Sequence, residues 1–151
     1  MVKFSVIRNL NFSDQQMYNL ISDVNKYPEF LPWCISTNVY NMSNDVFYSD
    51  MEIGFKLINE RFTSKVSLTP LNQVASEAIN GPFEKMINIW EIEYISKDKC
   101  EVCLHIEFEF KSFLLQSIMG TLFENASKKM IIAFEERANI LYNKKTNIYG
   151  I

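Results

Sequence analysis

The sequence from residue 100 to residue 142 reads CEVCLHIEFEFKSFLLQSIMGTLFENASKKMIIAFEERANILY, and its hydrophobic period changes near Lys111. Up to Phe110 every second residue is apolar, which predicts a strand with one apolar face. From residue 113 to about residue 143 the apolar residues recur every three or four positions, which predicts one long helix that can cover that face. The stripe of this helix contains Leu115, Met119, Leu122, Phe123, Ala126, Met130, Ala133, Phe134, Ala138 and Leu141.

Upstream, residues 35–110 contain turn signals at intervals typical of an antiparallel meander, so we expect six successive strands there. Residues 3–12 alternate in the same way and predict a further strand. Ser13 can then cap a helix, with Gln16 completing a capping box, and apolar residues at helical spacing follow. The turn signals are Asn44-Asp45, Pro70-Leu71-Asn72, Asn80-Gly81-Pro82 and Lys97-Asp98-Lys99, and the helical stripe is Met17, Leu20, Ile21 and Val24.

Two prolines mark a second, short helix, which Pro28 can begin and Pro32 can end. The stretch around them, YPEFLPW (residues 27–33), is apolar, although surface loops are normally polar. We interpret this lid segment as a gate to the interior and as a membrane-facing edge. The predicted gate consists of Tyr27, Pro28, Pro32 and, in the later turn NGPFEKM, Phe83.

The order of elements is strand, two helices, six strands and a long helix. This order predicts an α+β fold in which a curved, seven-stranded antiparallel sheet wraps around the C-terminal helix. No linker, repeat or shift in composition divides the chain, so we expect a single domain over residues 1–151.

The composition is that of a globular protein with an aromatic excess, since 48% of the residues are hydrophobic and 14% are aromatic. A net charge of −3 argues against DNA as a partner and against a general attraction to anionic surfaces. The first residues lack the pattern of a secretory signal, and no apolar run reaches the roughly 20 residues of a membrane-spanning helix. Three cysteines fit a reducing compartment. We therefore expect a cytoplasmic protein, peripheral at most at the inner face of the membrane.

Several separated motifs resemble one family in the same order: YPEFLPWC, ERFTSKVSLTP, NGPFEKMINIW and HIEFEFKSFLLQSIMGTLFENASKKMIIAFEERA. This is the family of coenzyme Q-binding START-like proteins, within the helix-grip superfamily of lipid-transfer START domains and the birch-pollen allergen. The same family contains a bacterial ribosome-association toxin and proteins called oligoketide cyclase or lipid transport protein. The motifs PWC and FTSKV look more like the mitochondrial quinone-binding branch, and the absence of a transit peptide implies a bacterial member.

The resemblance implies an apolar cavity that binds ubiquinone or a similar isoprenoid lipid as a ligand, and it implies no other cofactor. It further implies that the protein is a lipid carrier that supports respiration. Trp33 and Trp90 could stack on a quinone ring, and Tyr94 could donate a hydrogen bond. The alternative is that the facing side chains fill the space between sheet and helix. The residues expected to bind the lipid are Phe30, Leu31, Trp33, Phe62, Val66, Trp90, Tyr94, Leu104, Ile106, Phe108, Met119, Phe123, Met130 and Phe134.

The residues give little support to catalysis, so we expect no enzyme, and a polyketide cyclase is the least favoured reading. The single histidine, His105, falls on the polar face of its strand. Candidates for an acid or base inside the cavity are Glu60 and Ser64, which share strand parity with Phe62, and Glu77. The pair Cys100 and Cys103 points to opposite faces of a strand, so we expect no metal site.

The competing hypothesis is a toxin-like protein that binds the large ribosomal subunit and blocks subunit joining. It depends on the family resemblance, because acidic residues interleave with the basic residues of the last helix. The expected partners are therefore a quinone or similar lipid, a transient membrane surface and, under the competing hypothesis, the large ribosomal subunit. The basic residues are Lys128, Lys129, Arg137, Lys144 and Lys145, and the acidic ones are Glu124, Glu135 and Glu136.

Overall fold

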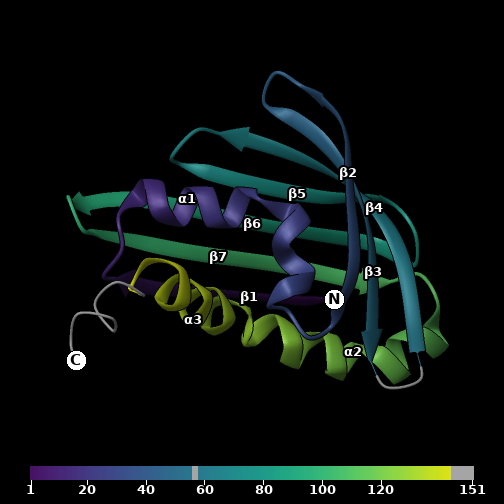
Figure 1. Cartoon of the computed structure of the whole chain (residues 1–151). Helices are drawn as coiled ribbons and strands as arrows, with labels where there is room; N and C mark the ends of the chain where they lie inside the picture. Colours follow the sequence, from purple (N-terminus) through teal and green to yellow (C-terminus); the bar gives the residue numbers. More distant parts are fainter. Residues whose placement is uncertain (56–57, 144–151) are drawn as a thin grey trace.

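The computed structural model describes residues 1–55 and 58–143. Its strands form one seven-stranded antiparallel sheet in the order β1-β7-β6-β5-β4-β3-β2, so β1 and β2 are the two edges (Figure 1). The predicted α+β fold with a seven-stranded antiparallel sheet is confirmed. The strands are β1 (Val2–Leu10), β2 (Cys34–Ser43), β3 (Val46–Phe55), β4 (Ile58–Thr69), β5 (Gln73–Asn80), β6 (Phe83–Ser96) and β7 (Lys99–Phe110).

Strand β7 has the alternation that its sequence predicts. The side chains between its apolar residues are half-buried on the opposite face of the sheet. Its partners are β1 and β6, so its apolar face lies well inside the sheet and must be covered. The residues on that face, each at most 4% exposed, are Val102, Leu104, Ile106, Phe108 and Phe110.

Helix α1 (Asp14–Ser22) begins at the predicted capping box. The Gln16 N–H donates to the Ser13 hydroxyl, and the Ser13 N–H donates to the Gln16 side chain, both at 3.0 Å. Two N–H groups that the helix itself cannot satisfy therefore have partners. The side chains that this helix buries are Met17, Leu20 and Ile21.

The short helix that follows is a 3-10 helix, η1 (Val24–Glu29), and it begins four residues earlier than predicted. Pro28 lies inside it rather than at its start. The backbone tolerates this proline because the hydrogen bonds run around it, from the Lys26 N–H to the Asp23 carbonyl and from the Phe30 N–H to the Tyr27 carbonyl. The prediction of a helix that starts at Pro28 is therefore wrong.

The predicted continuous C-terminal helix is divided at Lys129 into α2 (Phe113–Lys128) and α3 (Met130–Tyr142). Lys129 has a ψ of −6°, whereas an α-helix has about −42°. The apolar stripe shifts beyond this break, so Ile131 is 2% exposed while Leu141 is 45% exposed. All the helices lie on the same side of the sheet (Figure 1).

Replacing Ser13 with alanine removes the hydroxyl that accepts the Gln16 N–H. We expect the free energy of unfolding to fall by about 0.5–2 kcal/mol, measured by urea unfolding. The control is Gln15→Ala at an exposed position of the same helical turn, which should change it by less than about 0.5 kcal/mol. Equal losses in the two variants would contradict a capping role for Ser13.

Candidate ligand-binding cavity

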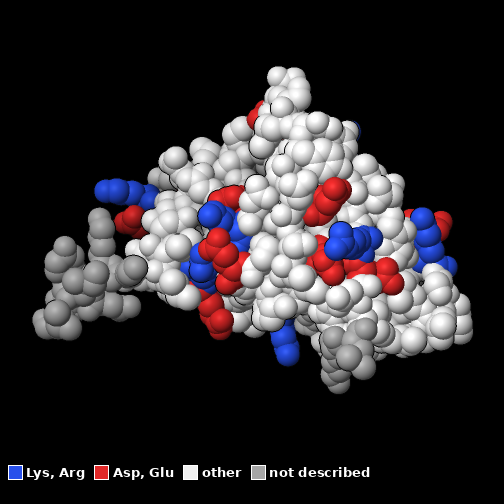
Figure 2. Space-filling model, turned by 45° about the vertical axis from the view of Figure 1, so that its right-hand side comes forward, with Lys and Arg blue, Asp and Glu red and all other residues white. Residues whose placement is uncertain are grey.

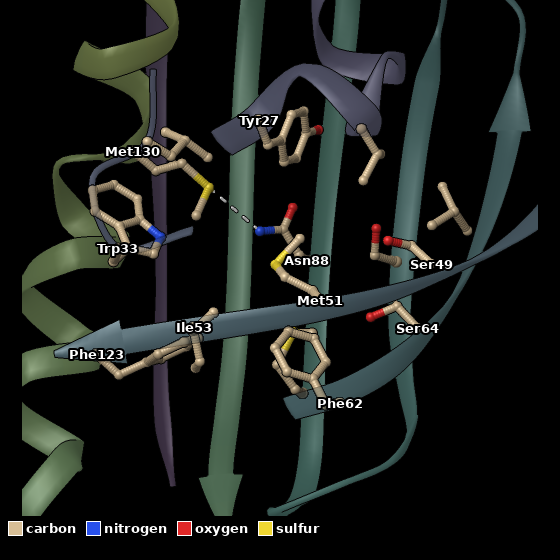
Figure 3. Close-up of a pocket in the computed structure, with 15 residues that line it drawn as sticks. Tyr27, Trp33, Ser49, Met51, Ile53, Phe62, Ser64, Asn88, Phe123 and Met130 are labelled. Carbon is tan, nitrogen blue, oxygen red and sulfur yellow. Dashed lines mark hydrogen bonds between the residues drawn. The ribbon is translucent and has the colours of Figure 1, made fainter. Parts of the chain in front are cut away.

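A cavity of about 70 Å³ lies between the inner face of the sheet and the helices (Figure 3). Strands β3, β4, β5 and β6 form one wall, and the opposite wall comes from η1, the lid segment, α2 and the first residue of α3. Most of the lining is apolar. The lining residues are Val24, Tyr27, Leu31, Trp33, Ser49, Met51, Ile53, Phe62, Ser64, Val66, Ser76, Met86, Asn88, Phe123 and Met130.

Four polar side chains interrupt this lining, one from each of the four strands, and we call them the polar row. Ser49 of β3 pairs directly with Ser64 of β4. Ser76 of β5 pairs directly with Asn88 of β6. Ser49 is 2% and Ser64 is 5% exposed, and in Figure 3 both hydroxyl groups point into the cavity.

The hydrogen bonding of the polar row is incomplete within the described residues. There the Ser49 hydroxyl has no partner. The Asn88 amide donates to the sulfur of Met130 at 3.6 Å, and a thioether is a weak acceptor. A buried hydroxyl without a partner costs about 1–3 kcal/mol, so the row favours a ligand that supplies hydrogen-bonding atoms.

The residues predicted to bind a lipid divide into two groups. One group lies on the cavity wall, and the other lies in the core around it, since strand parity gives the face of a residue but not its distance from the cavity. On the wall are Leu31, Trp33, Phe62, Val66, Phe123 and Met130. In the surrounding core are Phe30, Trp90, Leu104, Ile106, Phe108, Met119 and Phe134.

Two other predicted residues, Tyr94 and Phe83, do not line the cavity either. Tyr94 is 61% exposed, because β6 runs on past β5, whose last pair with it joins Glu91 and Gln73. Phe83 was predicted at the gate but is 4% exposed, and its ring stacks on that of Phe110 with centroids 4.7 Å apart. Phe83 starts β6 with its side chain turned inward, so it belongs to the core.

Other cavity residues were not predicted from the sequence. Ser49, Met51 and Ile53 alternate along β3, and this spacing was a usable signal for one inward face. Asn88 lies in phase with Trp90 on β6, where a polar residue on an apolar face could have indicated a site. The additional lining residues include Val24, Ser49, Met51, Ile53, Met86 and Asn88.

The lid segment is fastened to α3 by aromatic and charged contacts. The Phe134 ring meets the edges of Tyr27 and Phe30, with centroids 5.2 and 4.9 Å apart. The Tyr27 hydroxyl donates to a backbone carbonyl of α1, and burial raises the pKa of that hydroxyl. Arg137 donates to Glu29 at 2.7 Å and lies over the Phe30 ring. The other predicted gate residues of this segment, Pro28 and Pro32, are half-buried and exposed, respectively.

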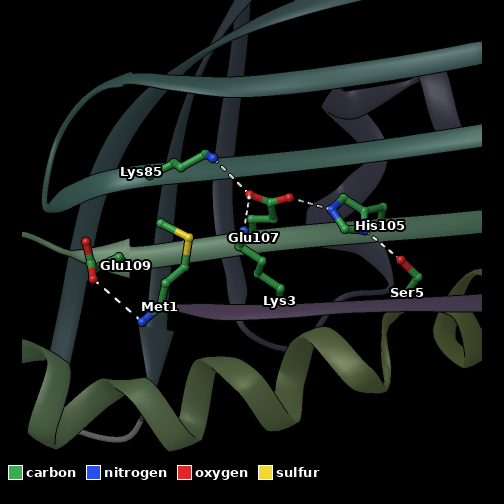
Figure 4. Close-up of polar contacts among 7 residues, drawn as sticks. All are labelled: Met1, Lys3, Ser5, Lys85, His105, Glu107 and Glu109. Carbon is green, nitrogen blue, oxygen red and sulfur yellow. Dashed lines mark hydrogen bonds and ion pairs between the residues drawn. The ribbon is translucent and has the colours of Figure 1, made fainter.

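A second polar cluster lies on the outer face of the sheet, away from the cavity (Figure 4). His105 Nδ1 lies 2.6 Å from the Ser5 hydroxyl, and its Nε2 lies 2.7 Å from Glu107. Lys85 donates to Glu107 at 2.9 Å, and hydrogen bonds from Lys85 and His105 lower the pKa of that carboxyl to about 2. The prediction that His105 lies on the polar face is confirmed, and this imidazole cannot act within the cavity.

Of the three residues considered from the sequence as an acid or base, only Ser64 lies on the cavity wall. Of the described residues that line it, none is acidic, basic or histidine, and neither Glu60 nor Glu77 is among them. Next to the lid segment, burial raises the pKa of the Cys34 thiol to about 12, so this thiol is a poor nucleophile. No cluster of metal-ligating side chains occurs in the part of the chain that the structure describes.

Acidic and basic side chains are interspersed on the face shown in Figure 2. On α2, Lys128 pairs with Glu124 at 2.9 Å, as the sequence spacing predicts. Lys144 and Lys145 lie outside the described residues. Among the helices that are described, none has the length and apolarity needed to cross a membrane.

Residues 10–135 match the family model for polyketide cyclase/dehydrase and lipid transport proteins. The chain is 31% identical over 148 residues to the mitochondrial coenzyme Q-binding protein COQ10 homolog B of Xenopus laevis, an alignment that covers 95% of this chain but only 61% of that protein. It is also 31% identical over 142 residues to the ribosome association toxin RatA of Rickettsia prowazekii, covering 91% of this chain and 97% of the toxin.

The crystal structure of the Zhui aromatase/cyclase from Streptomyces sp. R1128 has a TM-score of 0.81 to this chain. The alignment covers 94% of this chain and 97% of that one. At 11% identity this likeness shows a shared fold alone. From the sequence match over residues 10–135 and the helix-grip architecture, the chain belongs to the START-like family of polyketide cyclase/dehydrase and lipid transport proteins.

Proposed function

We propose that this chain binds ubiquinone or a related isoprenoid lipid between its sheet and its helices. It carries or positions that lipid for respiratory electron transport and catalyses no reaction. The observation that carries this proposal is a mainly apolar cavity between sheet and helices, with two buried serines on one wall, of which Ser49 has no hydrogen-bond partner among the described residues. The similarity to a coenzyme Q-binding protein over 148 residues supports the choice of lipid.

The cavity must widen to hold such a ligand. Its volume is about 70 Å³, whereas pockets for small ligands have roughly 300–1,000 Å³. Met51, Met86 and Met130 lie on its wall, and methionine side chains repack readily because they are unbranched and flexible. Trp33, which is half-buried on the lid segment, is the lining residue best placed to swing outward.

Burial of the tail supplies enough free energy for binding. At about 0.8 kcal/mol per CH₂, each five-carbon isoprenoid unit contributes on the order of 4 kcal/mol. A few units therefore offset the association cost of roughly 4–15 kcal/mol, and this tail needs no polar contacts.

The start of α2 is suited to transient contact with a membrane, where a carrier must collect its lipid. Phe113 is 89% and Leu114 is 68% exposed, and Ile118 on the next turn is 45% exposed. Three neighbouring apolar side chains on one helix can insert into the headgroup region of a bilayer. We propose this surface as the site of contact.

The second candidate function is ribosome association, favoured by the match to 97% of the length of a ribosome association toxin. Binding to the large ribosomal subunit would depend on phosphate contacts and would weaken steeply with salt. The interspersed charges of Figure 2 offer no concentrated basic surface for it on that face. Sedimentation with purified large subunits at low and high salt separates the two functions, since the lipid carrier should not sediment with them.

Val66→Phe should fill part of the cavity and exclude the lipid while the protein stays folded. Mass spectrometry of lipids extracted from the purified protein should show a stoichiometric quinone in the original chain and at least a tenfold loss in the variant. The control is Val46→Phe, the same change on the outward face of β3. A quinone retained equally by both variants would place the lipid elsewhere.

Replacing Phe113 and Leu114 with serine should leave the melting temperature unchanged, because both side chains are exposed. We expect the variant to lose most of its co-sedimentation with phosphatidylglycerol–phosphatidylethanolamine vesicles. Ile140→Ser, at a 62% exposed position of α3, serves as the control and should sediment normally. If the double variant also sediments normally, α2 is not the surface that contacts the membrane.

A further inference from the structure

The polar row can distinguish between classes of lipid, because its four members present hydroxyl and amide groups and no charge. Ser49 and Ser64 oppose each other across β3 and β4, and both are almost completely buried. The second directly opposed pair, Ser76 and Asn88, lies on β5 and β6, two residues along from the first pair, because Ser76 is opposite Val66 of β4. The row therefore crosses the sheet wall of the cavity.

We infer that the polar row binds the oxygen atoms of a neutral lipid head group, such as a quinone or a hydroxylated ring, and holds that head deep in the protein. This inference rests on the proposed function. A hydroxyl donates and accepts, so serine can bind either a carbonyl or a hydroxyl of the ligand. The Ser49 hydroxyl, without a partner among the described residues, is free to make such a bond.

A charged head group is disfavoured at the same place. No lining residue that the structure describes can neutralise a carboxylate or phosphate, because none is lysine, arginine or histidine. Burying such an anion without a partner costs far more than burying a bonded carbonyl. Fatty acids and phospholipids should therefore bind weakly compared with a neutral head on the same tail.

The position of the row also orients the ligand. The opposite side of the cavity is mainly apolar and includes Trp33, Phe123 and Met130 (Figure 3), together with Val24 and Leu31, and the hydroxyl of Tyr27 there is already bonded to a backbone carbonyl. Trp33 is half-buried and so lies near the surface. The head group should consequently enter first and meet the sheet, while the tail leaves past Trp33.

Three probes with a chain of ten carbon atoms test this assignment: decylubiquinone, decylbenzene, which lacks the head oxygens, and decanoate, whose chain ends in a charged carboxylate. Quenching of tryptophan fluorescence gives the affinity for decylubiquinone. Competition with bound decylubiquinone gives the affinities for decylbenzene and decanoate. We expect decylubiquinone to bind at least tenfold more tightly than decanoate. Ser49→Ala/Ser64→Ala should weaken decylubiquinone binding about tenfold and leave decylbenzene unaffected.

The control Ser43→Ala/Ser67→Ala changes two exposed serines of β2 and β4 and should leave all three affinities unchanged. Ser49→Ala alone should keep or raise the melting temperature, because it removes a buried hydroxyl that lacks a partner. A lower melting temperature would instead assign Ser49 a structural role and overturn the inference.

The remaining outcomes separate this inference from the proposed function. If the original chain binds decylubiquinone and the Ser49→Ala/Ser64→Ala variant binds it equally well, the polar row does not hold the head group, and the carrier function stands. Decanoate binding as tight as decylubiquinone binding would overturn the assignment to neutral lipids. If the original chain binds none of the probes, the proposed function fails and the inference fails with it.

Discussion

The contact between the apolar face of β7 and the C-terminal helices is the interaction on which the rest of the structure depends. The Phe108 ring on β7 meets Phe123 of α2 at 4.7 Å, and Phe110 at the end of the strand joins the same group of rings. The two C-terminal helices, α2 and α3, therefore lie along the β1–β7–β6 side of the sheet. The inner faces of β3 and β4 are left to face the lid segment, and the cavity lies there.

Aromatic groups lie at two ends of that cavity. Phe62, Phe83 and Phe123 pack edge to face or tilted with centroids 5.2–5.3 Å apart at one end. At the other end Phe134 holds Tyr27 of the lid segment at 5.2 Å. The interruption of the helix at Lys129 falls between these groups and places Met130 on the cavity wall. Aromatic rings thus lie near both ends of the cavity, and the side chains of Met51, Met86 and Met130 also line it.

Much of this fold could be predicted because strands and turns leave local signals. The alternation of β7 and the box formed by Ser13 and Gln16 depend on neighbouring residues alone. The break at Lys129 left no such signal, since neither proline nor glycine lies there. Tyr94 shares the parity of Trp90, yet it is exposed because β5 ends beforehand, and the relative lengths of paired strands are a tertiary property.

The cavity was harder to predict than the fold, because a wall residue and a core residue have the same strand parity. Val66 lines the cavity and Leu104 packs in the surrounding core, although both are buried inward-facing residues. The pairing of the two buried cavity serines could not be predicted for a different reason. Ser64 lies two residues from Phe62 and so shares its face by strand parity, but its pairing with Ser49 depends on the register of β3 against β4, which only the structure gives.

The central claim is that the interior opens around a lipid, and the seven methionines report on it directly. Methyl spectra of methionine-labelled protein should be recorded during a titration with decylubiquinone. Shifts confined mainly to Met51, Met86 and Met130 are predicted, while Met42, which is 61% exposed on β2, should not move. Shifts at Met42 alone, or no saturable shift at any methionine, would contradict an internal binding site.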